Sequence, residues 1–404
     1  MIVSHFHSLW QGLKDTLHIW QLESHIIFHD AGVLIFCLLV PLGYPLLYTV
    51  IYNTELMREV PITVVDQNHS ALSREFIRKV DASQWVKVVS SAQSEADAQE
   101  AIREGRTFGY LLLPGDFSSR LAEGRQAYVG MYADMSGLLY YKGILLAATD
   151  ASLEMNRDIK IRRAAKFTAE EDQIAAYPVK NEEVTLFNPT QGFASFLIPA
   201  VVILIIQQTL LLAIGMAGGT AEEKQEYGEL IATSRRSRGT FHIILGRALA
   251  YLLIYAVTSA YMTCVVPHLF QLPQLGRGAD LLLFLLPYVL ACIFFAMTLS
   301  ILMRHREMSI MVFVVTSVPL LFISGISWPA SAIPPFLKGV SWLFPSTFGI
   351  NGYVRINTMG ATLSQVRSEW LGLWAQTIIY FLTAYLSCRV ILHRSTRRAA
   401  ALKG

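Results

Sequence analysis

Six long apolar stretches, separated by polar segments, constrain the fold of this 404-residue chain more than any other feature. Each is close to the ~20 residues that an α-helix needs to cross the ~30 Å hydrocarbon core of a membrane. Only 16% of the residues are charged, whereas about a quarter are charged in an average soluble domain. We therefore predict an α-helical polytopic membrane protein with six transmembrane helices. They are expected at about residues 31–52, 192–217, 243–267, 281–303, 309–328 and 370–392.

Lysine and arginine in the short loops predict how these helices are oriented, because such loops are enriched in positive charge on the cytoplasmic side. The loop between the third and fourth helices, residues 271–280, has only Arg277. The loops after the second and fourth helices and the C-terminal end are much more basic. Their cations are Lys224, Arg235, Arg236, Arg238, Arg304, Arg306, Arg394, Arg397, Arg398 and Lys403. Both termini are therefore expected in the cytoplasm, with residues 393–404 forming a basic tail.

Residues 1–30 are expected to form an N-terminal amphipathic interfacial helix, because apolar side chains recur at helical spacing against polar ones. The apolar stripe consists of Phe6, Leu9, Trp10, Leu13, Leu17 and Trp20. His25 and His29 are four residues apart and would share a helical face. A metal site needs further ligands and an ordered surrounding shell, so we expect no metal here.

The segment between the first two helices, residues 53–191, has the pattern of an inserted α/β extracytoplasmic domain, because strand and helix signals alternate along it. The strands are expected at 62–65, 85–89, 107–113 and 127–132. The helices are expected at 70–80, 94–104 and 116–123, followed by a longer helix at about 137–167.

Enzymatic activity is disfavoured throughout the chain. Asp66, His69 and Ser70 are catalytic residue types, but they are adjacent in one turn, where helix capping explains them. The sequence has no G-x-S-x-G or H-E-x-x-H motif and no G-x-x-x-x-G-K-[ST] phosphate loop. We therefore expect no catalytic residues and no cofactor, and the net charge of +3 gives no reason to expect nucleic acid.

The centres of the six helices contain no ionisable carboxylate or amine, although such groups are common in proton- and sodium-driven transporters. Their polar residues are neutral, notably Gln207 and Gln208 in the second helix and Thr316 and Ser317 in the fifth. Buried amides are unfavourable without partners or water. These four residues are therefore predicted to line a translocation path, with hydrogen bonding between helices as the alternative.

An acidic run follows the second helix and is succeeded by a basic one. It is expected to form a cytoplasmic coupling helix at 218–240, through which a separate motor could move the transmembrane helices. The residues predicted to couple are Glu222, Glu223, Glu226, Gly228 and Glu229. The alternative is that these acids only solvate an exposed helix.

Tryptophan and proline interrupt the apolar pattern between the fifth and sixth helices. Non-helical backbone at membrane depth is tolerated only where protein covers it or a cavity borders it. We therefore expect re-entrant helices at 328–350 that act as a gate, with interfacial anchoring by tryptophan as the alternative. The predicted gate residues are Trp328, Pro329, Pro334, Pro335 and Pro345.

Four stretches together resemble the membrane (permease) subunit of a type-two ABC exporter with a large extracytoplasmic domain after the first span. They are residues 41–48, residues 64–74, the acidic run through Leu245-Gly246-Arg247, and residues 324–347. In that family the coupling element has glutamates four and two residues before a glycine. Here Glu226 precedes Gly228 as expected, but Lys224 occupies the earlier position.

The resemblance implies a permease in the bacterial cytoplasmic (inner) membrane that moves its substrate outward. The neutral, aromatic and amide-lined interior predicts an amphiphilic or hydrophobic substrate, such as a drug or a lipid-like molecule. It implies a cytoplasmic ABC ATPase subunit as partner, a second permease copy or a close homologue, and contact with membrane lipids. An envelope adaptor protein is a further candidate partner. The alternative function is a membrane-anchored scaffold or receptor without transport, which would have no need of a coupling helix.

Overall fold

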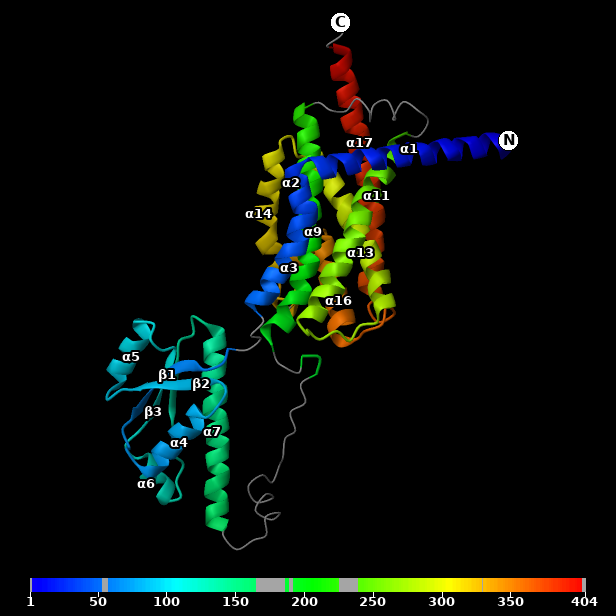
Figure 1. Cartoon of the computed structure of the whole chain (residues 1–404). Helices are drawn as coiled ribbons and strands as arrows, with labels where there is room; N and C mark the ends of the chain where they lie inside the picture. The colour runs from blue at the N-terminus through cyan, green and yellow to red at the C-terminus, as the bar shows by residue number, and fades with distance from the viewer. Residues whose placement is uncertain are drawn as a thin grey trace. The chain divides into compact units, whose positions relative to one another are not determined.

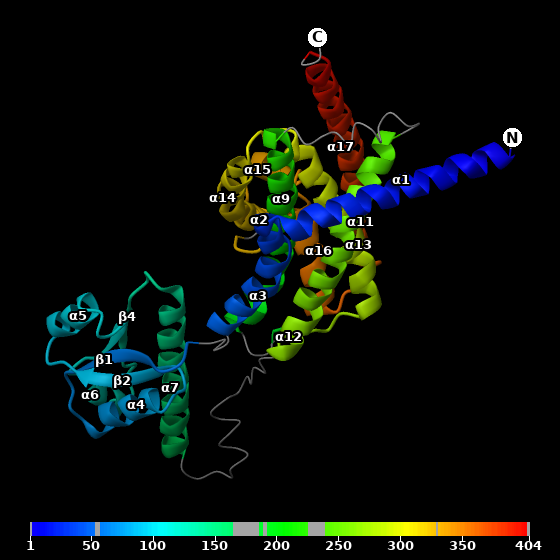
Figure 2. The same cartoon turned by 45° about the horizontal axis from the view of Figure 1, so that its top comes forward.

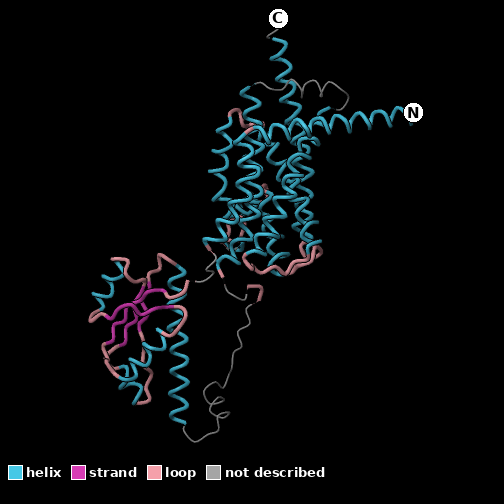
Figure 3. The backbone as a smooth tube through the Cα atoms, in the orientation of Figure 1, coloured by secondary structure: helices cyan, strands magenta, loops and turns pink. Residues whose placement is uncertain are grey.

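The computed structural model describes residues 2–52, 57–164, 186–188, 192–224, 239–328 and 330–401. The chain divides into two compact units, one formed by Met1–Glu55 with Thr185–Gly404 and the other by Leu56–Val184. Figure 1 shows both units, and Figure 3 shows that the strands belong to the second unit while the first is helical. We call them the membrane unit and the insert and describe each by itself.

Among its described residues, the membrane unit contains six helical segments long and apolar enough to cross a membrane, which confirms the predicted number and order. Two of them are divided by a π-helical stretch. The first segment comprises α2 (Ala31–Leu34), η1 (Ile35–Leu39) and α3 (Val40–Ile51). The third comprises α11 (Gly239–Ala260), η2 (Tyr261–Val265) and α12 (Val266–Leu269). The other four are α9 (Phe193–Lys224), α13 (Gly278–Ser300), α14 (Arg306–Ile323) and α17 (Arg367–Ala401).

Helix α9 is the central element of this bundle. Its sequence is apolar around the whole circumference, which is typical of a helix enclosed on all sides. It packs against α3, α13, α14 and α16 (Pro345–Met359), and 94% of its most apolar stretch is buried. It also continues to Lys224 without a break, so residues 218–224 of the predicted coupling segment are the last two turns of α9.

The N-terminal helix α1 (Ile2–His29) lies across the end of the bundle that carries both termini, as Figures 1 and 2 show. It packs against α11 through Gly12, Ile19 and Glu23, which are buried. Ile27, one turn after Glu23, is buried as well. The predicted apolar stripe lies on other faces. Its members Trp10, Leu13 and Leu17 are exposed and Trp20 is partly buried, while the side chains of Phe6 and Leu9 lie outside the described ones. A position of this stripe at the membrane interface stays a prediction.

Between α14 and α17 the chain forms three short helical elements: η3 (Ala330–Ala332), α15 (Pro335–Ser341) and α16. Proline at the first position of α15 and of α16 favours helix initiation there, because its missing N–H would have no helical partner and its φ is preset. Helix α16 enters the bundle and buries Gly349, Ile350 and Tyr353 against α9 and α13.

The insert has a four-stranded mixed sheet with strand order β2-β1-β3-β4, in which β1 pairs in parallel with β2 and β3, and β3 pairs antiparallel with β4. The alternation of strands and helices confirms the predicted α/β class. The strands are β1 (Val60–Asp66), β2 (Val86–Ser91), β3 (Gly109–Leu113) and β4 (Gly130–Ala133). The helices are α4 (Ala71–Asp81), α5 (Glu95–Arg103), α6 (Phe117–Ala122) and α7 (Leu138–Ala164).

The helices cover both faces of this sheet, so the insert has its own core. Helices α4, α6 and α7 pack on one face around Ile62, Phe76 and Leu111, and α5 packs on the other around Val65 and Tyr110. The capping expected at Ser70 is present, since its side chain accepts a hydrogen bond from the Ser73 amide at the start of α4. Ser94 likewise accepts a hydrogen bond from the Asp97 amide at the start of α5.

Candidate functional site

Gln207 lies in the middle of α9 and caps the beginning of α16. Its Oε1 accepts a hydrogen bond of 2.6 Å from the backbone amide of Ser346, which lies in the first turn of α16. The residue before that helix, Phe344, provides no side-chain cap. The first amides of a helix lack partners within it, so an amide oxygen from α9 satisfies one of them inside the bundle.

Gln208 Nε2 donates a hydrogen bond of 3.3 Å to Oγ1 of Thr316 in α14. Two of the predicted path residues, far apart in sequence, are therefore neighbours. Thr316 and Ser317 also donate to carbonyls of their own helix. Gln207 and Gln208 are only 1% and 3% exposed. Within the described residues, Gln207 Nε2 and Gln208 Oε1 have no hydrogen-bond partner, so half of each amide is unsatisfied.

The end of α9 contacts the turn between α13 and α14, which is formed by residues 301–305. Glu223 Oε1 lies 3.1 Å from His305 Nδ1. Glu222 lines a cavity beside this turn. The other residues predicted to couple, Glu226, Gly228 and Glu229, lie outside the described residues.

An ion pair links the first residue of α14, which follows that turn, to the start of the first transmembrane segment. Arg306 Nη2 and Nη1 donate to Asp30 Oδ1 and Oδ2 at 2.6 and 3.0 Å. Asp30 also caps α2 by accepting from the amides of Gly32 and Val33. Burial raises the pKa of the Asp30 carboxyl, but the hydrogen bonds and charge of Arg306, together with the amides, hold it below its usual range overall.

Glycines on α9 allow the α13–α14 turn to approach so closely. A Cβ at Gly219 would lie 2.8 Å from the backbone of His305, and one at Gly215 would lie 2.4 Å from the sulfur of Met303. Gly32 likewise leaves room for the Arg306 guanidinium. Sequence reasoning missed Asp30, His305 and Arg306. The glycine-rich run at the end of the second apolar stretch was a visible signal of close packing, but it does not identify the partner.

Side chains of neighbouring helices hold the predicted gate segment. Gln376 of α17 donates to the carbonyl of Trp342 at 2.7 Å, and Asn351 of α16 donates to the carbonyl of Ser324 at 3.0 Å. Of the predicted gate residues, Trp328, Pro334 and Pro335 are exposed, whereas Pro345 is buried at the start of α16. Pro329 lies outside the described residues.

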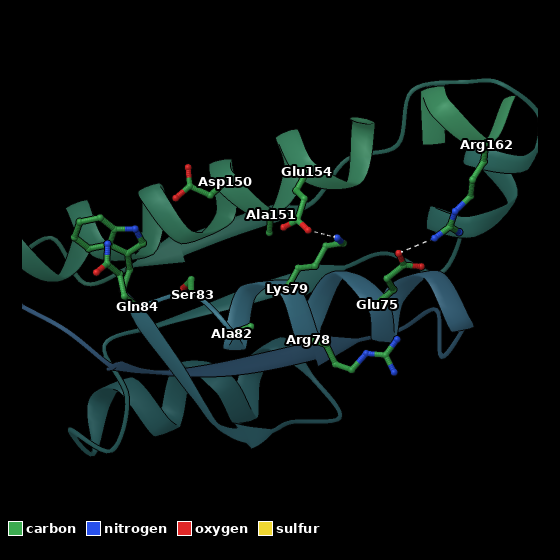
Figure 4. A pocket seen from close by; sticks show the side chains of 11 residues that line it. Glu75, Arg78, Lys79, Ala82, Ser83, Gln84, Asp150, Ala151, Glu154 and Arg162 are labelled. Atoms are coloured by element: carbon green, nitrogen blue, oxygen red, sulfur yellow. Dashed lines mark hydrogen bonds and ion pairs between the residues drawn. The ribbon is translucent and has the colours of Figure 1, made fainter. Parts of the chain in front are cut away.

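A groove on the insert lies between α4 and α7, and its charged side chains are largely paired with one another (Figure 4). Lys79 of α4 contacts Glu154 and Asp158 of α7 at 2.6 and 2.9 Å, and Arg162 contacts Glu75 at 3.0 Å. The pKa of Lys79 is raised by Glu154 and Asp158. These pairs join the two helices, so their charges are already neutralised.

Residues discussed above as catalytic or metal-binding candidates have structural contacts. Asp66 accepts hydrogen bonds from the amides of Asn68 and His69 and from the Ser73 hydroxyl. The rings of His25 and His29 stack 3.8 Å apart. In the part of the chain that the structure describes, no three His, Cys, Asp or Glu side chains are grouped in a way that could hold a metal ion.

Comparison with known proteins gives one family match. The family described as ABC-2 family transporter protein matches residues 31–386. This range includes the first five transmembrane segments and the insert, and it ends within the sixth segment, α17.

Two curated bacterial relatives are similar over different lengths. The linearmycin resistance permease protein LnrN of Bacillus subtilis is 22% identical over 370 residues, which cover 88% of this chain and 94% of LnrN. The probable multidrug ABC transporter permease YbhR of Escherichia coli is 20% identical over 193 residues, which cover 48% of this chain and 51% of YbhR.

Proposed function

Because the chain belongs to the ABC-2 transporter family, as a membrane subunit without an ATPase domain, we propose that it exports an amphiphilic or hydrophobic molecule from the cytoplasm or the inner leaflet. Its relatives are named as permeases for linearmycin resistance and for multiple drugs. A molecule of the same broad class, drug or lipid-like, is the proposed substrate here. Family membership favours this function over a scaffold or receptor without transport.

The observation that carries the proposal is the pair of half-satisfied amides in α9. An unsatisfied polar group in an apolar interior is costly, so Gln207 and Gln208 are expected to meet water, substrate or a second permease copy during transport. The neutral surroundings suit a ligand bound mainly by apolar contact with a few polar groups. Thr316 and Ser317 on α14 complete the proposed path.

The energy is proposed to come from a cytoplasmic ATPase subunit, because ABC permeases generally pair with one. The acidic run is proposed to dock on it, with Glu223 transmitting movement to His305 and so to the α13–α14 turn. The segment at 328–350 is proposed to close the outer end of the path. In this arrangement both termini are cytoplasmic and the insert is extracytoplasmic.

The coupling test uses the permease reconstituted with the ATPase subunit of its transporter. Glu226→Arg should lower ATPase stimulation and ATP-dependent uptake of a fluorescent amphiphilic dye into inverted vesicles by roughly fivefold, corresponding to about 1 kcal/mol of docking energy. The matched control is Glu123→Arg, an exposed charge reversal in the insert, which should leave both activities unchanged. Full stimulation by the Glu226 variant would place the docking site elsewhere.

The path test uses cysteines at positions 208 and 316 in a protein lacking Cys37, Cys264, Cys292 and Cys388. A small water-soluble thiol reagent should label them, and the labelling should change when nucleotide is trapped on the ATPase. A cysteine replacing Leu210, which is fully buried on the same helix, should stay protected. Protection of all three positions in every nucleotide state would show that these polar residues only join helices.

A further inference from the structure

A cavity of about 200 Å³ lies at the end of the membrane unit that carries both termini. Five helices form it: α1, α9, α11, α13 and α17 all contribute lining residues, α13 together with the turn that follows it. Part of the wall is apolar and includes Leu22, Ile26 and Ile391. Ile26 is 38% exposed, so the apolar wall continues onto the surface of the unit.

Three arginines line the same cavity: Arg247 of α11, Arg304 of the α13–α14 turn and Arg394 of α17. Arg304 and Arg394 are exposed, and neither forms an ion pair with any described residue. Two acids, Glu23 and Glu222, also line the cavity. Among the described lining residues, positive charge therefore exceeds negative charge by one, and two of the three cations have no ion-pair partner there.

Arg247 is held deeper in the cavity by Glu23, whose side chain is only 6% exposed. Arg247 Nη2 donates to Glu23 Oε1 at 3.1 Å, and Arg247 Nε lies 3.1 Å from Oε2. The second contact lacks hydrogen-bond geometry, so Nε is buried without an acceptor in the described residues. The buried ion pair with Glu23 fixes the position of the Arg247 charge, but it leaves the Nε–H donor without a hydrogen-bond acceptor.

We propose that this cavity binds the headgroup of an anionic phospholipid. A phosphate ester would accept hydrogen bonds from Arg304 and Arg394, for which guanidinium groups are well suited. Its acyl chains would follow the apolar wall at Ile26 and Ile391. Basic pockets between transmembrane helices are sites of this kind. The arginines lie near the ends of three candidate spans, at Lys224, Ser300 and Arg394, and the ends of transmembrane helices are where lipid headgroups are expected.

A lipid suits this site better than a free anion because half of the lining is apolar and open toward the surface. The groove on the insert is the contrasting case, since its cations are mostly paired within the protein. The inference uses the membrane location of the family and does not depend on the exported substrate.

The experiment measures lipid bound to the purified full-length permease by native mass spectrometry. The protein is titrated with phosphatidylglycerol or with phosphatidylcholine of the same acyl chains. Wild type should bind phosphatidylglycerol preferentially, and the double variant Arg304→Gln/Arg394→Gln should bind it at least about tenfold more weakly, as expected from about 1 kcal/mol per basic residue near a membrane surface. Arg389→Gln, on α17 but outside the cavity, is the matched control and should bind as wild type.

A second variant tests the cavity without removing charge. Ala221 lines it, and Ala221→Phe should fill it and weaken phosphatidylglycerol binding while all three arginines remain. The lysine pair Arg304→Lys/Arg394→Lys should retain preferential binding. If the Arg389 variant lost phosphatidylglycerol binding to the same extent, the preference would come from general surface charge and not from the cavity. Displacement of the lipid by millimolar inorganic phosphate would indicate a free-anion site, and either result overturns the proposal.

Discussion

The Asp30–Arg306 pair joins residues 276 positions apart and closes the junction of three elements: the end of α1, the start of α2 and the start of α14. No local pattern in the sequence connects these two residues, because each is an ordinary charge at the end of an apolar stretch. Arg306 was predicted only as a cytoplasmic cation, and Asp30 was assigned no role. Their contact depends on tertiary packing, which includes the space left by Gly32.

Asp30→Asn and Arg306→Gln should each destabilise the membrane unit by about 2 kcal/mol, since each leaves a partly buried charge without its partner. Thermal unfolding in detergent should show that the double variant loses less than the sum, with a coupling of about 1 kcal/mol. The exposed pair Arg103–Glu100 is the control and should show little coupling. If the stability losses of Asp30→Asn and Arg306→Gln simply added in the double variant, the two residues would not interact as described.

The same pair predicts a pH dependence. The pKa of Asp30 is lower in the folded protein than its usual value, so the carboxylate contributes stability above the unfolded pKa of about 4. This contribution is lost as the pH falls through the folded pKa. The stability difference between wild type and Asp30→Asn should therefore be full at pH 7 and shrink below about pH 4. A difference that stays constant down to pH 2 would show that charge is not its cause.

At the scale of elements, the sequence predicted well which helices and strands are present and in what order, because periodicity and hydropathy are local properties. All six membrane segments and all four strands were found from them. Packing was less predictable. The buried face of α1 was missed, because two of its buried residues, Gly12 and Glu23, are not apolar and do not mark a contact face in the sequence. The contact of α9 with the α13–α14 turn was missed for the same reason, because glycine has no side chain to mark it.

The glycines on α9 give a prediction at this scale. Gly219→Ala should destabilise the bundle by about 1–3 kcal/mol, because the new methyl group would overlap the backbone at His305. Gly43→Ala in α3 is the matched control. A Cβ there meets nothing within 4 Å, and alanine is the better helix former, so its melting temperature should be unchanged or higher. Equal stability of both variants would show that the turn can move away from α9.

For the whole molecule, the division into two units follows from composition: charge is dense in the insert and sparse in the helices. The insert has its own core on both faces of its sheet. Its fold class was therefore readable from alternating strand and helix signals. The surroundings of the proposed translocation path could be predicted only in part, because the partners of Gln207 and Gln208 come from α16 and α14 and lie more than 100 residues away in the sequence.

Cysteine labelling tests the proposed orientation of the whole chain. In intact cells, an impermeant thiol reagent should label cysteines that replace Ser91 and Ala122, because both belong to the insert. Cysteines that replace Ser234 and Ala400 should react only after the membrane is opened, in keeping with the basic loops on the cytoplasmic side. Labelling of position 234 from outside would contradict the six-span topology.

Through the cap that Gln207 provides to α16, helix α9 connects the start of α16 with the contact between Glu223 and His305. Sixteen residues separate Gln207 from Glu223, about 24 Å at 1.5 Å per residue, and one continuous hydrogen-bonded helix spans them. Because a helix is stiff along its axis, an axial displacement of the Glu223 end would move Gln207 relative to the Ser346 amide by nearly the same distance. The capping hydrogen bond is 2.6 Å long. A displacement of about 1 Å away from Ser346 would lengthen it beyond hydrogen-bonding distance and separate the first turn of α16 from α9.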